Sequence, residues 1–145
     1  IGCDSGPWTI ALLFRKPILL TNYTQINTLN KLHYDKLFII LKKFKFKNNN
    51  KLLSLREIYE NKAEEILKTE QLDNKGIDLV DNDEDEILNA TKELFIQYLS
   101  FYDKEKYNNI VQDKFWNILN NKPHSSKNIN ICNSFLNENK FLYLD

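Results

Sequence analysis

The chain has 145 residues, and its 20 Lys and Arg balance its 20 Asp and Glu, so the formal net charge is zero. This length and a composition that is 42% hydrophobic and 28% charged indicate one globular domain rather than a disordered chain. Zero net charge gives no general attraction to nucleic acid or to an anionic membrane surface, and no apolar run approaches the roughly 20 residues of a membrane span. Cys3 and Cys132 form no CxxC pair, which excludes a disulfide scaffold and disfavours structural zinc.

The start of the chain reads as a strand end, a turn and a helix. The sequence has no Met and opens on Ile1-Gly2, so we expect a fragment that lacks its N-terminal portion. Pro7 suits a first helical position, because its missing N–H would be unpaired there in any case. Residues 8–14 are apolar on nearly all sides, which predicts a short buried helix. Residues 17–21 predict a buried parallel strand.

The middle of the chain alternates apolar runs with polar connections. Residues 22–34 indicate a polar loop, 37–41 a second buried strand, and 42–51 a basic, exposed connection. Ser54 followed by Glu57 fits the capping box, which predicts a helix start. The apolar residues at helical spacing after it are Leu55, Ile58, Tyr59, Ala63, Ile66 and Leu67.

The second half predicts one strand and three helices. Residues 76–80 indicate a short strand, and the acidic residues 81–85 suit the N-terminus of a helix, because they complement its dipole. The core face of that helix is expected at Ile87, Leu88, Thr91, Leu94, Phe95, Tyr98, Leu99 and Tyr102. A further helix is expected to carry Tyr107, Ile110, Val111, Phe115, Ile118 and Leu119. Residues 120–130 indicate a loop, 134–136 a final short helix, and 141–144 an apolar patch. This alternation predicts an α/β fold with a mostly parallel sheet and flanking helices.

The turn from Gly2 to Gly6 carries the most chemistry. Both glycines can take backbone angles closed to other residues and let a ligand approach the main chain. Unpaired amides and the positive dipole end of the following helix favour an anion such as phosphate, and the Ser5 hydroxyl adds a donor. Asp4 is better suited to cap a backbone N–H or to accept a sugar hydroxyl. The same residues also make an ordinary tight turn with a helix cap, and the local pattern leaves both interpretations open.

Several segments together resemble a known family. Residues 1–7 with 16–23 resemble the C-terminal half of a bacterial glycosyltransferase family linked to surface carbohydrate biosynthesis. Three further stretches resemble later motifs of that family: residues 53–58, residues 76–82 with 85–87, and residues 133–139. The resemblance covers nearly the whole chain and implies the GT-B architecture of two Rossmann-like domains, of which this chain would be the C-terminal one. Cys3 departs from the small residue, often Thr, expected at that position.

The resemblance implies a hexosyltransferase-type activity in which the turn holds the diphosphate of a nucleotide sugar. The donor-binding residues that it implies are Gly2, Asp4, Ser5, Gly6, Asn22 and Tyr23. No metal or other cofactor is implied, because helix dipoles and side chains stabilise the departing diphosphate in such enzymes. We expect a Rossmann-like donor domain at 1–120, truncated at its N-terminus, and a C-terminal extension that packs on it at 121–145.

The implied partners are a nucleotide sugar, a glycan or lipid-linked acceptor, and the missing N-terminal domain, but not nucleic acid. That domain binds the acceptor and often supplies the catalytic base, so no catalytic residue is assigned and the 145 residues alone are expected to be inactive. The implied location is cytoplasmic, at the inner face of the membrane where the acceptor is lipid-linked. The alternative is a non-catalytic α/β module that binds another phosphate ligand or a partner through the same turn.

Three other features have ordinary explanations. His33 and His124 lie in expected loops without a Ser or Cys partner, which favours solvated side chains. The acidic residues 81–86 lack the glycine and the last Glu of an EF-hand, so helix capping is favoured over calcium binding. The basic run 42–47 could bind nucleic acid or make a peripheral membrane contact, but an edge strand protected by lysines is favoured.

Overall fold

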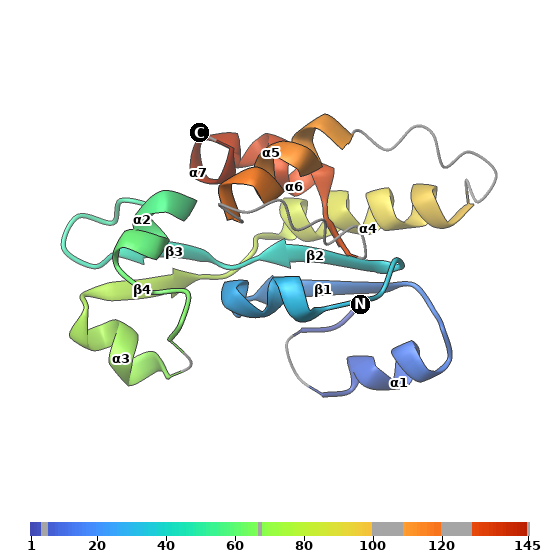
Figure 1. Cartoon of the computed structure of the whole chain (residues 1–145), viewed down its shortest axis with the longest axis horizontal. Coiled ribbons are helices and arrows are strands. Elements are labelled where there is room, and N and C mark those ends of the chain that lie inside the picture. Colours follow the sequence, from blue (N-terminus) through green and yellow to red (C-terminus); the bar gives the residue numbers. More distant parts are fainter. Residues whose placement is uncertain (4–5, 67, 100–108, 120–128, 145) are drawn as a thin grey trace.

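A three-stranded parallel sheet forms the centre of the computed structural model, which describes residues 1–3, 6–66, 68–99, 109–119 and 129–144 (Figure 1). Its order is β1 (Ile18–Tyr23), β2 (Leu37–Leu41) and β5 (Asn130–Ile131). Gly2 extends the sheet beyond β1 as a parallel bridge to Leu20. Its N–H donates to the Leu19 carbonyl at 2.9 Å, and its carbonyl accepts from the Thr21 N–H at 2.9 Å. The predicted α/β fold, the strand end at Gly2 and both buried strands are confirmed.

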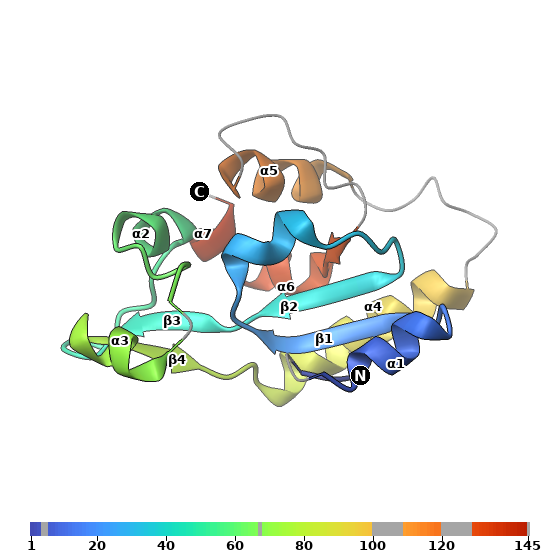
Figure 2. The ribbon, with the colours of Figure 1, turned by 60° about the horizontal axis from the view of Figure 1, so that its bottom comes forward.

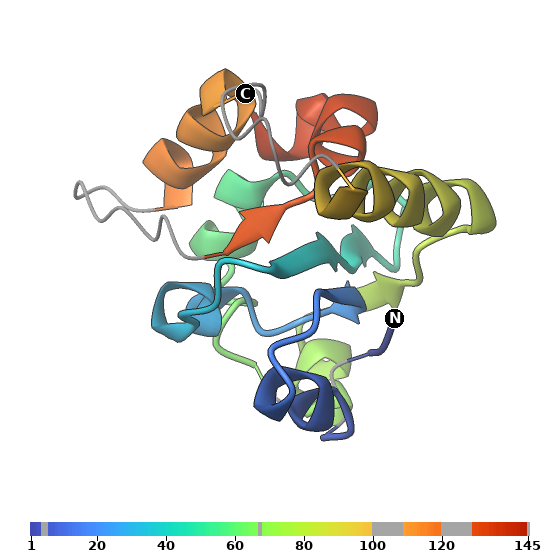
Figure 3. The same ribbon diagram turned by 90° about the vertical axis from the view of Figure 1, so that its right-hand side faces the viewer.

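The sheet is covered on both faces, which explains why its strands are continuous apolar runs. Every residue of β2 is buried, and β1 is buried except at Asn22. Figure 3 shows the sheet between α4 (Glu84–Leu99) on one side and the 3₁₀ helix η1 (Ile26–Lys31) on the other. The prediction of a polar loop at 22–34 was wrong, because Ile26 and Leu29 are fully buried against the sheet.

The third strand, β5, lies where the sequence indicated a loop. Its far edge is paired by a side chain of α5 (Asn109–Leu119): the Gln112 amide donates to the Ile131 carbonyl and accepts from the Ile131 N–H. The Gln112 side-chain amide therefore makes the two hydrogen bonds that a fourth strand would make with Ile131, since buried backbone groups need partners. The segment expected as a C-terminal extension also contributes fully buried residues. They are Ile131, Cys132, Phe135 and Leu136.

A two-stranded antiparallel ribbon leaves the end of β2 (Figure 1). It pairs β3 (Lys43–Phe46) with β4 (Ile77–Val80), and it carries α2 (Leu55–Glu60) and α3 (Thr69–Asn74). The predicted strand at 76–80 is confirmed. The prediction of an exposed connection at 42–51 is confirmed at 47–51 but was wrong for the strand before it, because Phe44 is 2% exposed and Lys43 is also buried.

Helix α2 begins as predicted and ends early. Ser54 and Glu57 form the full capping box: the Ser54 N–H donates to Glu57 Oε2 at 2.9 Å and the Glu57 N–H to Ser54 Oγ at 3.3 Å. Lys62 then takes a left-handed φ of 50°, and the Ala63 N–H returns to the Ile58 carbonyl. This reversal terminates the helix, so the later apolar residues of the expected helical pattern lie beyond it.

The remaining helices are α1 (Trp8–Leu13), α6 (Asn133–Glu138) and α7 (Lys140–Tyr143), and the predicted helices at 8–14 and 134–136 are confirmed in position. The predicted burial of α1 was wrong: it lies along β1 at the edge of the sheet (Figure 2) and has no buried residue. The expected core face of α4 is also shifted. Ala90 is fully buried, but Leu88, Phe95 and Tyr98 are 48%, 60% and 45% exposed.

Candidate functional site

The candidate site is the edge at which the parallel strands end. β1 ends at Tyr23, β2 at Leu41 and β5 at Ile131, and Gly2, which bridges Leu20 of β1 in parallel, approaches the same edge. Ligands of open α/β sheets bind outside these carboxyl ends, because loops and helix starts converge there. Asp4 and Ser5, two of the expected donor-binding residues, lie outside the described residues.

The turn glycines are not used in the way the sequence suggested. Among the described residues, the glycine with a positive φ is Gly76, so neither Gly2 nor Gly6 needs the backbone freedom that we expected of them. A Cβ on Gly6 would meet no atom within 4 Å, whereas one on Gly2 would touch Trp8 and Leu20. Gly6 therefore leaves open space beside the main chain, and this space rather than strain makes close approach of a ligand feasible.

The first amides of α1 already have partners. The Thr9 N–H donates to the Gly6 carbonyl and the Ile10 N–H to the Pro7 carbonyl, both at 3.1 Å. The Thr9 hydroxyl also donates to the Gly6 carbonyl at 2.6 Å. The expectation of unpaired amides at the start of this helix is corrected for these two groups, so donors to an anion would have to come from the turn before them.

Asn22 joins the ends of separate strands. It has a left-handed φ of 55° at an irregularity in β1, a conformation that Asn tolerates better than most residues. Its N–H donates to Asn82 Oδ1, and its own Oδ1 accepts from the Asn82 N–H, both at 2.7 Å. Asn82 Nδ2 also donates to the Leu41 carbonyl at 2.8 Å. The Asn22–Asn82 pair therefore joins β1, β2 and the end of β4 to one another at this edge.

Tyr23 points into the core rather than toward solvent. Its side chain is 4% exposed, and its hydroxyl pairs with Thr28 Oγ1 at 2.7 Å. Its carbonyl accepts from the Lys42 N–H at 2.9 Å. A ligand at this edge would accordingly approach the backbone near Tyr23 and not the aromatic ring.

A buried ion pair lies behind the edge, and the sequence did not reveal it. Lys43 Nζ lies 2.8 Å from both carboxylate oxygens of Glu86, and Asn139 Nδ2 donates to Glu86 Oε1 at 2.8 Å. The Asp83 N–H donates to Glu86 Oε2, and the Glu86 N–H to Asp83 Oδ1. The predicted capping role of this acidic segment is confirmed, and the Asp83-to-Glu86 spacing was the one visible signal. Both carboxylate oxygens of Glu86 thus have hydrogen-bond partners, as a buried carboxylate requires.

A second carboxylate closes the junction between β5 and α6. Glu93 of α4 accepts from the Asn133 and Ser134 N–H groups at 2.8 Å and from Ser134 Oγ at 2.7 Å. These amides are the ones that would otherwise face an anion at the start of α6. The protein's own carboxylate therefore occupies the position that an external anion would take at this junction.

The basic run 42–47 is not a free cationic surface. Lys42 pairs with Asp81 at 2.7 Å, Lys45 with Asp78 at 3.6 Å and Lys47 with Asp73 at 2.6 Å. The hydrogen bond to Asp73 raises the pKa of Lys47. Each of these lysines is matched by a carboxylate of β4, of the residue that follows β4 or of α3, which leaves little net charge for an external anion.

Other candidate residues add no reactive centre. His33 is exposed, and His124 lies outside the described residues. Within the ranges that the structure describes, no three His, Cys, Asp or Glu side chains are grouped so as to hold a metal ion. Burial, and secondarily the charge of Glu86, raises the pKa of the Tyr143 hydroxyl far above its ordinary value. No helix in the described ranges is both long and apolar enough to cross a membrane.

The chain is an α/β protein with a parallel sheet. The buried Lys43–Glu86 ion pair lies behind the carboxyl edge of the sheet, and Gly2 lies beside that edge. No family model, curated protein or solved structure matches the chain.

Proposed function

We propose that this chain is the donor-binding portion of a GT-B-type glycosyltransferase, with a Rossmann-like sheet whose carboxyl edge receives the diphosphate of a nucleotide sugar. The turn from Gly2 to Gly6 would contact the diphosphate through its main chain. The proposal rests on the family resemblance of the sequence together with the position of that turn at the carboxyl edge.

One observation carries the proposal: segments chosen for their resemblance alone meet at this edge. Asn22 and Asn82 come from different resembling segments and exchange two hydrogen bonds across 60 residues of chain. Asn139, from a third such segment, donates to Glu86 across 53 residues. Since the segments were not selected for proximity, their convergence supports a shared role in building one site.

The proposed site would have to stabilise the negative charge of a departing diphosphate. A departing diphosphate needs preorganised hydrogen-bond donors where its charge develops, and main-chain amides beside an open glycine can supply them. Gly6 is a position where a ligand can come close to the backbone, because a Cβ there would meet no atom within 4 Å.

The test is calorimetric titration of the chain with UDP, GDP and their sugar conjugates. We expect binding by at least one nucleotide sugar and its loss in Gly6→Val, which should leave the fold intact because an added Cβ meets no atom within 4 Å. Gly76→Ala is the matched control: its φ of 66° makes the substitution cost about 1 kcal/mol of stability. It lies at the outer end of the β3–β4 ribbon and should keep full affinity.

Two results would count against the proposal. Unchanged binding by Gly6→Val would remove the turn from the site. Equal affinity for inorganic pyrophosphate and for every nucleotide sugar would favour the non-catalytic phosphate-binding module instead.

A further inference from the structure

Helix α1 presents an apolar face to solvent. Ile10, Leu13 and Phe14 are 59%, 80% and 70% exposed. Their spacing of three and four residues places them on one side of the helix. The opposite side, with Trp8, Ala11 and Leu12 half-buried, packs against the core. Three large apolar side chains grouped on so short a helix are more than scattered surface hydrophobics, and such grouping marks an interaction surface.

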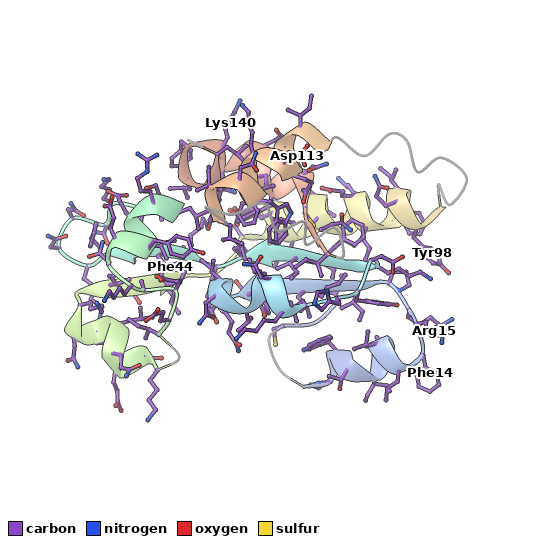
Figure 4. All side chains as sticks on the ribbon, viewed as in Figure 1. Phe14, Arg15, Phe44, Tyr98, Asp113 and Lys140 are labelled. Carbon is purple, nitrogen blue, oxygen red and sulfur yellow. The ribbon has the colours of Figure 1, made fainter. Side chains whose placement is uncertain are left out.

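Two exposed cations follow this face directly. Arg15 and Lys16 form no ion pair with any described residue, in contrast to the lysines of β3. Figure 4 shows Phe14 and Arg15 projecting outward from the same end of α1. The Lys16 carbonyl accepts from the Tyr34 hydroxyl at 3.0 Å, which ties this end of α1 to the loop before β2.

The stretch between Asp4 and Asp35 contains no acid. Residues 6–34 contain Arg15, Lys16 and Lys31 but no Asp or Glu, although the whole chain is neutral. The apolar face therefore lies in a stretch of the chain that carries three cations and no acid. The nearest acid in the sequence after it, Asp35, is followed at once by Lys36.

We propose that α1 docks the protein on an anionic lipid bilayer, with Ile10, Leu13 and Phe14 in the headgroup region and Arg15 and Lys16 on the lipid phosphates. Exposed apolar residues next to unpaired cations are the combination that interfacial helices use. A second copy of the chain fits this face less well, because a symmetric contact would bring the same cations against each other. The inference does not depend on the proposed donor site.

The test is sedimentation of the chain with phosphatidylcholine vesicles that contain or lack phosphatidylglycerol. We expect partition onto the anionic vesicles that falls at high salt, because salt screens exposed charges. Leu13→Ser with Phe14→Ser should lower it at least tenfold, by about the worth of two partly inserted apolar side chains. Arg15→Gln with Lys16→Gln should lower it about thirtyfold.

The matched controls are on α7, where Phe141 is also an exposed apolar residue and is preceded by the exposed Lys140. Phe141→Ser and Lys140→Gln should leave partition unchanged. Circular dichroism checks that each variant folds, which is expected because none of the changed side chains is buried.

Three outcomes would overturn the inference: no partition of the unchanged chain onto anionic vesicles, equal partition with and without phosphatidylglycerol, or equal loss in the α7 controls. Concentration-dependent dimerisation in the ultracentrifuge that Leu13→Ser with Phe14→Ser abolishes, without vesicle binding, would assign the face to a second copy.

Discussion

Two strand-to-helix junctions lie at the carboxyl edge of the same parallel sheet, and they are finished differently. At the junction of β5 and α6, Glu93 satisfies the Asn133 and Ser134 amides from within the protein. At the junction of Gly2 and α1, the space beside Gly6 is open and the helix is exposed. The closed junction is stabilised by the protein's own carboxylate, whereas at the open one a Cβ on Gly6 would meet no atom within 4 Å. Changes on the closed side should cost stability, and changes on the open side should cost binding.

The largest loss of stability is expected at the buried Lys43–Glu86 ion pair, which lies behind the closed junction. Glu86→Ala would leave the Lys43 ammonium buried without its partner, and Glu86 is itself 4% exposed. We expect a loss of about 3–5 kcal/mol in the free energy of unfolding, measured by urea denaturation. Asp85→Ala, at an exposed neighbour, should change it by less than about 0.5 kcal/mol. Equal effects of the two substitutions would show that the ion pair does not hold this edge together.

A smaller loss is expected at the closed junction itself. Glu93→Ala removes the acceptor of three hydrogen bonds at the start of α6. We expect about 2 kcal/mol of destabilisation in the same assay, because hydrogen bonds to a charged group are among the stronger ones. The exposed neighbour Lys92 offers the control Lys92→Ala. If the amides of α6 are satisfied equally well by water, Glu93→Ala will be nearly neutral.

Replacement of a third carboxylate, Glu64, should raise the free energy of unfolding rather than lower it. Glu64 is 7% exposed, and its Oε2 has no hydrogen-bond partner. Burial raises the pKa of Glu64, and burial together with the Glu64 charge raises the pKa of Tyr59 to about 12. Because the folded state favours the protonated acid, ionisation of Glu64 costs stability as the pH rises through its ordinary pKa of 4.5 and above.

Glu64→Gln should therefore stabilise the protein at neutral pH, by on the order of 1 kcal/mol. The gain should vanish at a pH well below 4.5, where the acid is protonated in both the folded and the unfolded chain. Thermal unfolding across this pH range measures it, with Glu65→Gln at the exposed neighbour as control. A destabilised Glu64→Gln at neutral pH would mean that the carboxylate has a partner in solution.

The smallest effect on stability is expected on the open side. Phe14→Ser changes a side chain that is 70% exposed, so the free energy of unfolding should move by less than about 0.5 kcal/mol. A loss of several kcal/mol in urea denaturation would instead place Phe14 in a packed contact, and the comparison of an open with a closed side would fail.

The sequence predicted the local features well, because each depends on neighbouring residues. Ser54 and Glu57 lie three residues apart and cap α2 as expected, and residues 37–41 are apolar enough to define β2 without further information. The start of α1 directly after Pro7 was also predicted correctly. The burial of α1 was misjudged, since apolar composition does not say which neighbours are present to cover a helix.

The positions of two candidate residues were predicted, but their contacts were not. Gly2 and Asn22 lie at the carboxyl edge as expected, but the pairing of Asn22 with Asn82 was not foreseen. The partners of Lys43 were also missed, because a run of lysines looks the same whether its acids are near or far in space.

By itself, the sequence determined an α/β chain with buried parallel strands, a capped α2 and a glycine turn before α1, since periodicity and capping act over a few residues. The tertiary structure alone decided that Gln112 completes the edge of β5, that Glu86 neutralises Lys43 and that Glu93 closes the start of α6. These pairings join residues from 19 to 43 positions apart, and their free energy comes from burial that exists only once the sheet and its helices are assembled.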